Sequence, residues 1–309
     1  ADALPVNIEI KQADFAERFA AVKGELAKSS SANLLIIDQF GIMFEQIVQL
    51  ETTDVLFFVS SATFSLIGLY VGVIPVFLGI CWLPALRRLG PGFFVFLMAL
   101  TAGMLVYLGI DATQEALELR EGIGDALQGT GLVGIGIAGS FLLLQAISRR
   151  ESRAARGEAE QRTSLAFLIS VGIGLHNFGE GLAIGAAYSV GAAALGTYLV
   201  VGFIVQNVTE GLGIIAPILR QRTSLGQLAL MGAIAGLPAN LGCYLGGFNY
   251  YQPLALIFFA IGAGAVFQVA WAICKRLLQD MEKTPRPLTA FSGALAGMAG
   301  LWLTGLLIK

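Results

Sequence analysis

The sequence predicts an all-α membrane protein in which eight transmembrane helices follow an N-terminal extramembrane segment with an amphipathic helix. Composition is the first observation behind this prediction, since 56% of the 309 residues are hydrophobic and only 13% are charged. A soluble globular domain carries about 25% charged residues, and the mean hydropathy here is +0.76. A net charge of −2 without a basic block argues against nucleic-acid binding, and three cysteines are too few for a disulfide scaffold.

Long stretches without charged residues are the second observation, because a helix that crosses the bilayer needs about 20 apolar residues. The stretch from Arg222 to Lys275 contains no charge, and the polar segment 246–253 divides it into two helices. The stretch between Arg162 and Arg220 also holds two helices, with Glu180 and Glu210 as its only charged residues. In order, the predicted helices cover residues 55–83, 92–110, 126–148, 164–188, 192–218, 223–248, 253–274 and 288–308.

The distribution of basic residues predicts the orientation of these helices. Lys and Arg are enriched in the cytoplasmic loops of membrane proteins. With the N-terminus outside, the predicted inner loops contain 13 of the 19 Lys and Arg residues. We therefore expect a multi-pass protein of the cell (inner) membrane whose two termini are both extracytoplasmic. The charged run 149–162, between the third and fourth helices, is expected to be a solvated loop.

The first 53 residues differ in composition from the remainder and predict an extracytoplasmic segment, 1–53, before a membrane domain at 54–309. Apolar residues recur at helical spacing between Phe15 and Leu26 in a charged setting, which is typical of an amphipathic helix. The stretch 34–50 is more apolar but is interrupted by acidic residues. We expect it to lie on the membrane or pack on the helices, with a ninth span as the alternative.

Two carboxylates lie in the middle of predicted helices, whereas the other acidic residues lie in the N-terminal segment, in loops or at helix ends. They are Glu180 in the fourth helix and Glu210 in the fifth. An unpaired carboxylate at that depth is costly and by default marks a functional site. The only histidine, His176, precedes Glu180 by four residues, so both side chains share one face of the helix.

The fifth helix repeats this arrangement. The sequence His-Asn-Phe-Gly-Glu-Gly at 176–181 corresponds to Gln-Asn-Val-Thr-Glu-Gly at 206–211. Two polar stripes on consecutive helices can converge on a single cluster. Its expected members are His176, Asn177, Glu180, Gln206, Asn207 and Glu210.

Such a cluster needs a positive charge that the sequence does not supply at that depth. Two carboxylates and one divalent cation sum to zero. An imidazole, an amide carbonyl and two carboxylates suit Zn²⁺, Fe²⁺, Mn²⁺ or Co²⁺, and the lack of a thiolate argues against Cu(I). The alternative is a structural role, since buried Glu, Asn and Gln side chains also join membrane helices by hydrogen bonds.

These motifs, with the number and orientation of the helices, resemble the Zrt/Irt-like (ZIP) family of divalent-metal transporters over residues 55–309. That family has eight spans, both termini outside and a His-Asn-x-Pro-Glu-Gly motif on its fourth span. The resemblance implies that Asn177 matches a ligand of a second, adjacent metal site. It also implies a homodimer in which spans 1, 4, 5 and 6 move against spans 2, 3, 7 and 8. The implied ligands of the main transport site are His176, Glu180, Gln206 and Glu210.

The sequence departs from the family pattern at several positions. Gly179 and Thr209 replace family prolines, and Asn207 replaces a carboxylate that is present in members with two metal sites. The sixth helix has Ala239 where the family usually has a glutamate, and the seventh helix offers only Gln268. We therefore expect one metal ion per subunit.

The second helix also resembles the family, in the stretch Ala-Gly-Met-Leu-Val-Tyr at 102–107 and in the acids that follow it. The resemblance implies that Asp111 and Glu115 lie near the outer mouth, where they would draw cations inward. The alternative is that they are ordinary outer-loop acids that continue into Glu118 and Glu121.

These observations favour a carrier that lies in the lipid bilayer and brings a divalent transition metal such as zinc, iron or manganese into the cytoplasm. The alternative is a membrane protein that binds metal as a sensor or regulator without efficient transport. An intramembrane zinc protease needs two histidines on one helix and a general base. One histidine in the whole sequence therefore argues against an enzyme.

Overall fold

The computed structural model describes residues 60–122, 129–155, 157–248 and 250–306. Within these ranges every regular element is helical, and eight helices are long and apolar enough to cross a membrane. The predicted all-α fold with eight spans is therefore confirmed. The predicted N-terminal segment 1–53 lies outside the described residues, whereas Phe64–Lys309 forms one compact unit.

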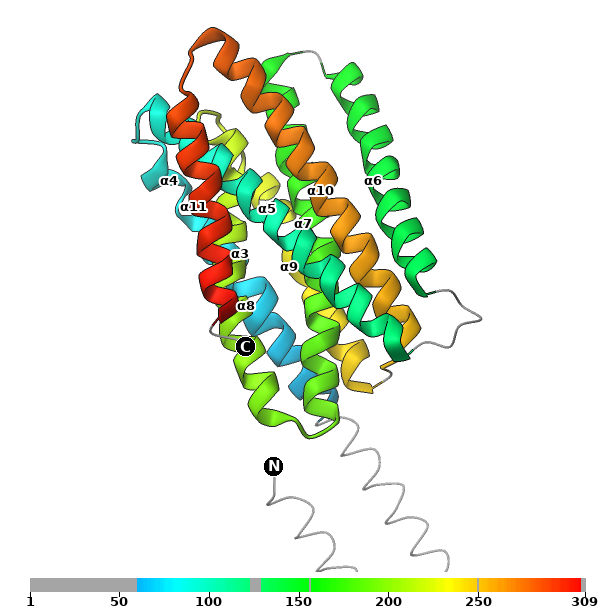
Figure 1. The fold of residues 1–309 in the computed structure, drawn as a ribbon. Coiled ribbons are helices and arrows are strands. Elements are labelled where there is room, and N and C mark those ends of the chain that lie inside the picture. Colours follow the sequence, from blue (N-terminus) through cyan, green and yellow to red (C-terminus); the bar gives the residue numbers. More distant parts are fainter. Residues whose placement is uncertain (1–59, 123–128, 156, 249, 307–309) are drawn as a thin grey trace, which may run out of the picture. The chain divides into compact units, whose positions relative to one another are not determined.

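The spans follow one another in the predicted order (Figure 1). The first span, Ser60–Leu86, contains the π-helical turn η1 and the helices α3 and α4. A short 3-10 helix, η2 (Arg120–Gly122), extends α5, and another, η4 (Ala216–Ile218), extends α8. The bounds of the other elements are η1 (Leu69–Val73), α3 (Ile74–Cys81), α4 (Leu83–Leu86), α5 (Pro91–Leu119), α6 (Gly129–Ala154), α7 (Glu158–Ser189), α8 (Ala193–Ile215), α9 (Leu225–Phe248), α10 (Gln252–Lys283) and α11 (Pro287–Leu306).

Two expectations about helix ends are wrong. The charged run 149–162 is not a solvated loop, because α6 continues to Ala154 and α7 begins at Glu158. Likewise α5 continues beyond the predicted end at residue 110 as far as Leu119, so Asp111 and Glu115 lie on a helix. Charged residues do not end these helices, since the helical backbone satisfies its own hydrogen bonds and the charged side chains can reach the aqueous interface.

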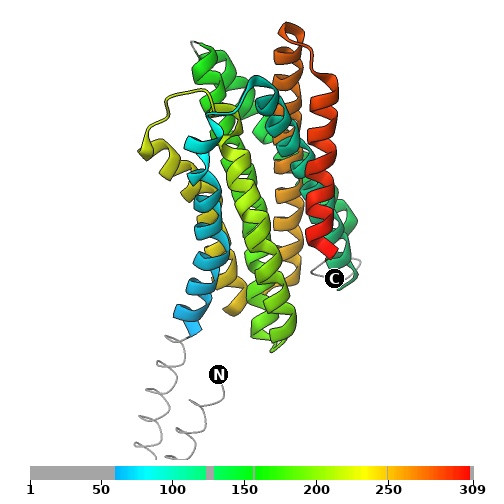
Figure 2. The same ribbon diagram turned by 90° about the vertical axis from the view of Figure 1, so that its left-hand side faces the viewer.

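The helices pack in two groups. One group consists of η1, α3, α7, α8 and α9, and the other consists of α5, α6, α10 and α11. Figure 2 shows the first span and α9 on one side of the view, with α10 and α11 on the other. The pair α7 and α10 is the main contact between the groups.

Glycines allow the closest packing, which is between α7 and α9. A Cβ atom added at Gly185 would meet the carbonyl oxygen of Cys243, and one added at Gly242 would meet that of Phe178. Small residues at such contacts are typical of membrane helices, because they let two backbones approach closely. The opposite holds for Gly139 on α6, where a Cβ would meet nothing within 4 Å.

Replacing Gly185 by valine is expected to destabilise the protein by about 1–3 kcal/mol, the usual penalty of overpacking. The added atoms would meet backbone, which cannot move aside as a flexible side chain can. Thermal unfolding in detergent micelles measures the effect, with Gly139→Val on α6 as the matched control. Equal losses in the two variants would contradict the close packing of α7 on α9.

Candidate metal centre

The polar side chains of the two repeated motifs lie together and are buried where α7 and α8 face each other. None of the six exposes more than 8% of its surface. Their spacing explains the arrangement, because residues i and i+4 lie on one face of a helix and both helices turn that face inward. The structure thus brings together all six predicted residues: His176, Asn177 and Glu180 from α7, and Gln206, Asn207 and Glu210 from α8.

The side-chain amide of Gln206 lies at the centre of one half of this cluster. Its Nε2 atom donates a hydrogen bond to Glu180 Oε1, and it lies 3.4 Å from His176 Nε2 and 3.5 Å from Glu210 Oε1. His176 Nε2 is in turn 3.2 Å from Glu180 Oε1. The imidazole and both carboxylates therefore converge on one point.

Several atoms at this point are buried and have unused bonding capacity. Among the described residues, His176 Nδ1, Asn177 Oδ1 and Glu180 Oε2 have no hydrogen-bond partner. The one ion-pair contact described for either glutamate is that of Glu180 with His176. Buried charges are normally paired or coordinate a metal, and no Lys or Arg of the described residues supplies the pairing here.

The cluster is not a ready-made group of acidic and histidine ligands. In the described part of the chain, no three His, Cys, Asp or Glu side chains are arranged to hold a metal ion. The amide of Gln206 is in contact with both carboxylates and with the imidazole. A metal centre here therefore has to include Gln206 as a member.

The two asparagines form the other half of the cluster and hold Glu210 in place. Asn177 Nδ2 lies 2.8 Å from Asn207 Oδ1 and 3.0 Å from Glu210 Oε2, and it donates to both. The same amide is 3.2 Å from the carbonyl oxygen of Ala235 on α9. The Asn177 side chain therefore orients a carboxylate and joins α7 to α8 and α9.

Asn207 extends this connection to the first span. Its Nδ2 atom donates to the carbonyl oxygen of Val71 in η1, at 3.0 Å. Four residues after Val71 the chain has Pro75, which has no N–H group and so cannot supply the usual helical hydrogen bond to that carbonyl. Val71 could not be found from the polar motifs of the sequence, because it contributes a backbone carbonyl and not a side chain.

The two acids of the second span lie in order along α5. Asp111 is half-buried and interacts electrostatically with both His176 and Glu180. Glu115, one turn further along, is exposed and lies near Tyr250, which follows α9. Burial, together with the Glu115 carboxylate, raises the pKa of Tyr250 above its usual value. Asp111 thus lies between Glu115 and the cluster along the direction of the helix.

The residues that depart from the family pattern have their own contacts. Gln268 on α10 donates to Gln145 on α6 at 3.0 Å, so this amide bonds away from the cluster. Thr209 Oγ1 donates to the carbonyl oxygen of Gln206 at 2.6 Å. Gly179 packs against the ring of Phe259, and a side chain there would crowd that ring.

In fold and site, the chain is a multi-pass helical membrane protein with a polar centre buried between two of its spans. Residues 142–304, more than half of the chain, match the family described as ZIP zinc transporter. The chain belongs to the ZIP zinc transporter family.

Individual relatives show a similarity of limited extent. The zinc transporter ZIP6 of Homo sapiens is 34% identical over 125 residues, which make up 40% of this chain and 16% of that protein. The zinc transporter ZIP10 of Mus musculus is 30% identical over 109 residues, or 35% of this chain and 13% of the relative. The chain therefore matches only a small part of the length of each relative.

Replacing Asn177 by alanine is expected to lower the free energy of unfolding by about 1–3 kcal/mol, because buried acceptors on α8 and α9 lose their donor. The comparison is Asn240→Ala, which removes a single bond to the carbonyl oxygen of Ser65 and should lose about 0.5–1.5 kcal/mol. Unfolding in detergent, followed by circular dichroism, measures both. A larger loss for Asn240→Ala would show that the asparagine pair does not join the helices as described.

Proposed function

We propose that this protein carries a divalent transition metal, zinc foremost, into the cytoplasm through the cluster between α7 and α8. The observation that carries the proposal is that Glu180 and Glu210 are buried in adjacent spans without a Lys or Arg partner among the described residues. Membership of the ZIP family supports metal transport rather than catalysis, and both relatives are named zinc transporters. The same ligand set also accepts Fe²⁺, Mn²⁺ and Co²⁺.

The distances in the cluster support a four-coordinate ion. Ligands that surround zinc tetrahedrally at about 2.1 Å lie roughly 3.4 Å from one another. Three of the six pairs of candidate ligand atoms show this spacing, at 3.2, 3.4 and 3.5 Å, and Gln206 lies closer to Glu180. A half-turn of the Gln206 amide would present Oε1 in place of Nε2, since an amide offers an acceptor at one end and donors at the other. His176, Glu180, Gln206 and Glu210 would then hold the ion.

We also propose a single metal site in each chain. Asn207 uses both ends of its amide in hydrogen bonds, to Asn177 and to Val71. The Nδ2 group of Asn177 faces Glu210, and an N–H donor is not a metal ligand. Hydrogen bonds therefore occupy both ends of the Asn207 amide and the Nδ2 group of Asn177, and Asn177 Oδ1 alone of these amide atoms has no partner among the described residues.

The direction of transport is inferred from the two ends of the helices. Basic residues gather at the end where α6 meets α7 and α10 meets α11, and such residues favour the cytoplasmic side. Asp111 and Glu115 lie beyond the cluster, near the opposite end of α5, where they would attract cations from outside. This orientation places both termini outside the cytoplasm, in the cell (inner) membrane.

The proposed movement follows the two packing groups. The asparagine pair joins the first span to α7, α8 and α9, which are spans 4, 5 and 6 of the first group. These spans would move together, with the cluster, against α5, α6, α10 and α11. The second group would supply the stationary part of a homodimer.

Replacing Glu180 or Glu210 by alanine is expected to lower zinc affinity by more than about a hundredfold. This loss exceeds the roughly 10- to 100-fold loss that follows when a residue that only hydrogen-bonds to a metal ligand is changed. Uptake into proteoliposomes should be lost with it. Asn207→Ala should have a smaller effect on affinity, and Gln268→Ala, a buried amide outside the cluster, should retain uptake. Zinc binding by the wild-type protein without any uptake would favour the sensor alternative, and unchanged affinity in both glutamate variants would overturn the proposal.

Elemental analysis of the purified chain after removal of loosely bound metal is expected to give one zinc ion per chain. The same measurement on Glu210→Ala should give none. Two tightly bound ions per wild-type chain would contradict the proposal that hydrogen bonds between asparagines take the place of a second site.

A further inference from the structure

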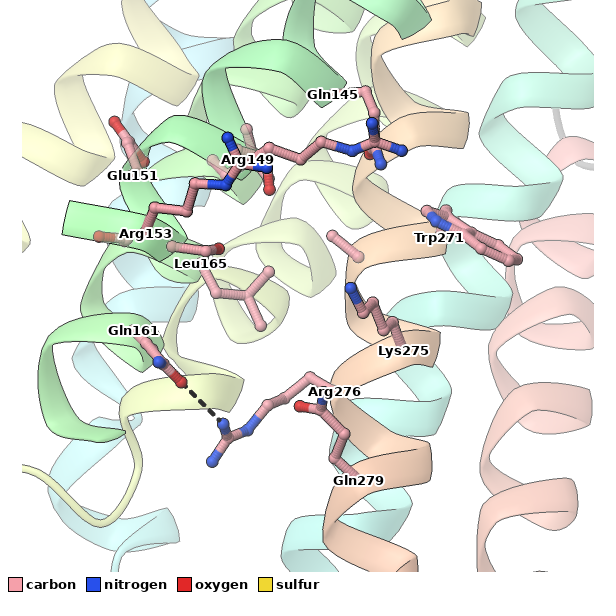
Figure 3. A pocket seen from close by; sticks show the side chains of 15 residues that line it. Gln145, Arg149, Glu151, Arg153, Gln161, Leu165, Trp271, Lys275, Arg276 and Gln279 are labelled. Atoms are coloured by element: carbon pink, nitrogen blue, oxygen red, sulfur yellow. Dashed lines mark hydrogen bonds between the residues drawn. The ribbon is translucent and has the colours of Figure 1, made fainter. Parts of the chain in front are cut away.

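A cavity of about 520 Å³ lies between α6, α7 and α10 at the basic end of the helices (Figure 3). Four basic side chains line it, against one acidic side chain, Glu151. The rest of its polar lining consists of glutamines and serines, and Figure 3 shows Gln161 bonded to Arg276 across the gap from α7 to α10. The basic residues are Arg149 and Arg153 on α6, and Lys275 and Arg276 on α10.

Two carboxylates beside the cavity are already paired. Asp280 lies 2.9 Å from Arg162 and 3.4 Å from Arg276. Glu158 lies 2.9 Å from Arg162 and 2.6 Å from Arg276. These two acids therefore balance the two arginines, and Arg276 is the only one of the four basic residues of the cavity that takes part.

The other three cations of the cavity are not balanced. In the ranges that the structure describes, Arg149, Arg153 and Lys275 have no ion pair or hydrogen bond, and neither does Glu151. Arg149 and Arg153 are four residues apart on α6, so their charges repel each other on one face of the helix. The cavity thus has a surplus of positive charge and several N–H donors without an acceptor among the described residues.

The cavity opens beside apolar surface. Trp271 precedes Lys275 by one helical turn on the same face of α10 and exposes 56% of its surface. Tryptophan is enriched where membrane meets water, since its ring is apolar and its N–H group is polar. On α6 the exposed side chain of Leu142 lies seven residues, or about two turns, before Arg149 on the same face of the helix. Polar headgroups and acyl chains would therefore meet at this position.

We propose that this cavity binds the phosphate group of an anionic phospholipid, whose acyl chains lie along Trp271 and the apolar face of α6. Arginine binds phosphate oxygens through paired, charge-assisted hydrogen bonds, and basic pockets between membrane helices are suited to anionic headgroups. The lipid would join α6 to α10. This matters because α6 packs chiefly on α10 and has open space at two of its glycines, Gly134 and Gly139.

Native mass spectrometry of the full chain in detergent, with phosphatidylglycerol or phosphatidylcholine added, tests the proposal. We expect the wild-type protein to retain phosphatidylglycerol selectively. The variant Arg149→Gln/Arg153→Gln/Lys275→Gln should lose roughly tenfold in affinity for each cation removed, the usual effect of losing a hydrogen bond to a charged group. The control Arg88→Gln/Arg150→Gln/Arg222→Gln removes the same charge from exposed residues that do not line the cavity, and it should bind the lipid as the wild-type protein does.

Thermal unfolding in nanodiscs provides the second measurement. Phosphatidylglycerol in a phosphatidylcholine disc should raise the unfolding temperature of the wild-type and control proteins but not that of the cavity variant. In phosphatidylcholine alone the cavity variant should unfold no earlier than the wild type, because repulsion among its cations is removed.

Several results would overturn the proposal. Equal lipid loss in the two triple variants would mean that only diffuse surface charge attracts the lipid. No selectivity of the wild-type protein for phosphatidylglycerol would remove the site altogether. Stabilisation by inorganic phosphate in phosphatidylcholine discs, to the same extent as by the anionic lipid, would assign the cavity to a soluble phosphate instead. All three outcomes are independent of whether the protein transports zinc.

Discussion

A carboxylate buried between membrane helices needs either a cation or hydrogen-bond donors, and this requirement organises the centre of the protein. In the described part of the chain, Glu180 and Glu210 have no Lys or Arg partner and contact His176 and the amides of Gln206 and Asn177. Those amides can reach the carboxylates because α7 and α8 carry the same spacing of polar residues. The glycines between α7 and α9 also bring the carbonyl of Ala235 within reach of Asn177. Once the Gln206 amide presents its oxygen, a bound ion would take over the role of its N–H group toward both carboxylates.

The fold and most of the central cluster could be predicted because each leaves a strong periodic signal in the sequence. Charge is so unfavourable within the bilayer that the gaps between charged residues give the number of spans. The spacing of His176 and Glu180, repeated by Gln206 and Glu210, places these side chains on two helix faces without knowledge of the packing. Which way each amide points depends on its neighbours in three dimensions, and the donor role of Gln206 and Asn177 could not be read from the sequence.

Other features could not be predicted because they depend on helix ends or on contacts between distant segments. The charged run 149–162 has the composition of a loop, yet it continues α6 and begins α7. Only this extension of the helices aligns Arg149 and Arg153 with Lys275 across a cavity. The pairing of Glu158 with Arg276 likewise joins residues 118 positions apart. No local pattern indicates such a distant pair.

The hydrogen bond from Asn207 to Val71 links the number of metal ions to the attachment of the first span. Pro75 has no N–H group to offer that carbonyl, and the amide of Asn207 donates to it. A carboxylate at position 207 would offer a ligand for another ion, but it has no hydrogen to donate. Ancestral or engineered chains that acquired a second ion by this route would have to fasten the first span to α8 in some other way.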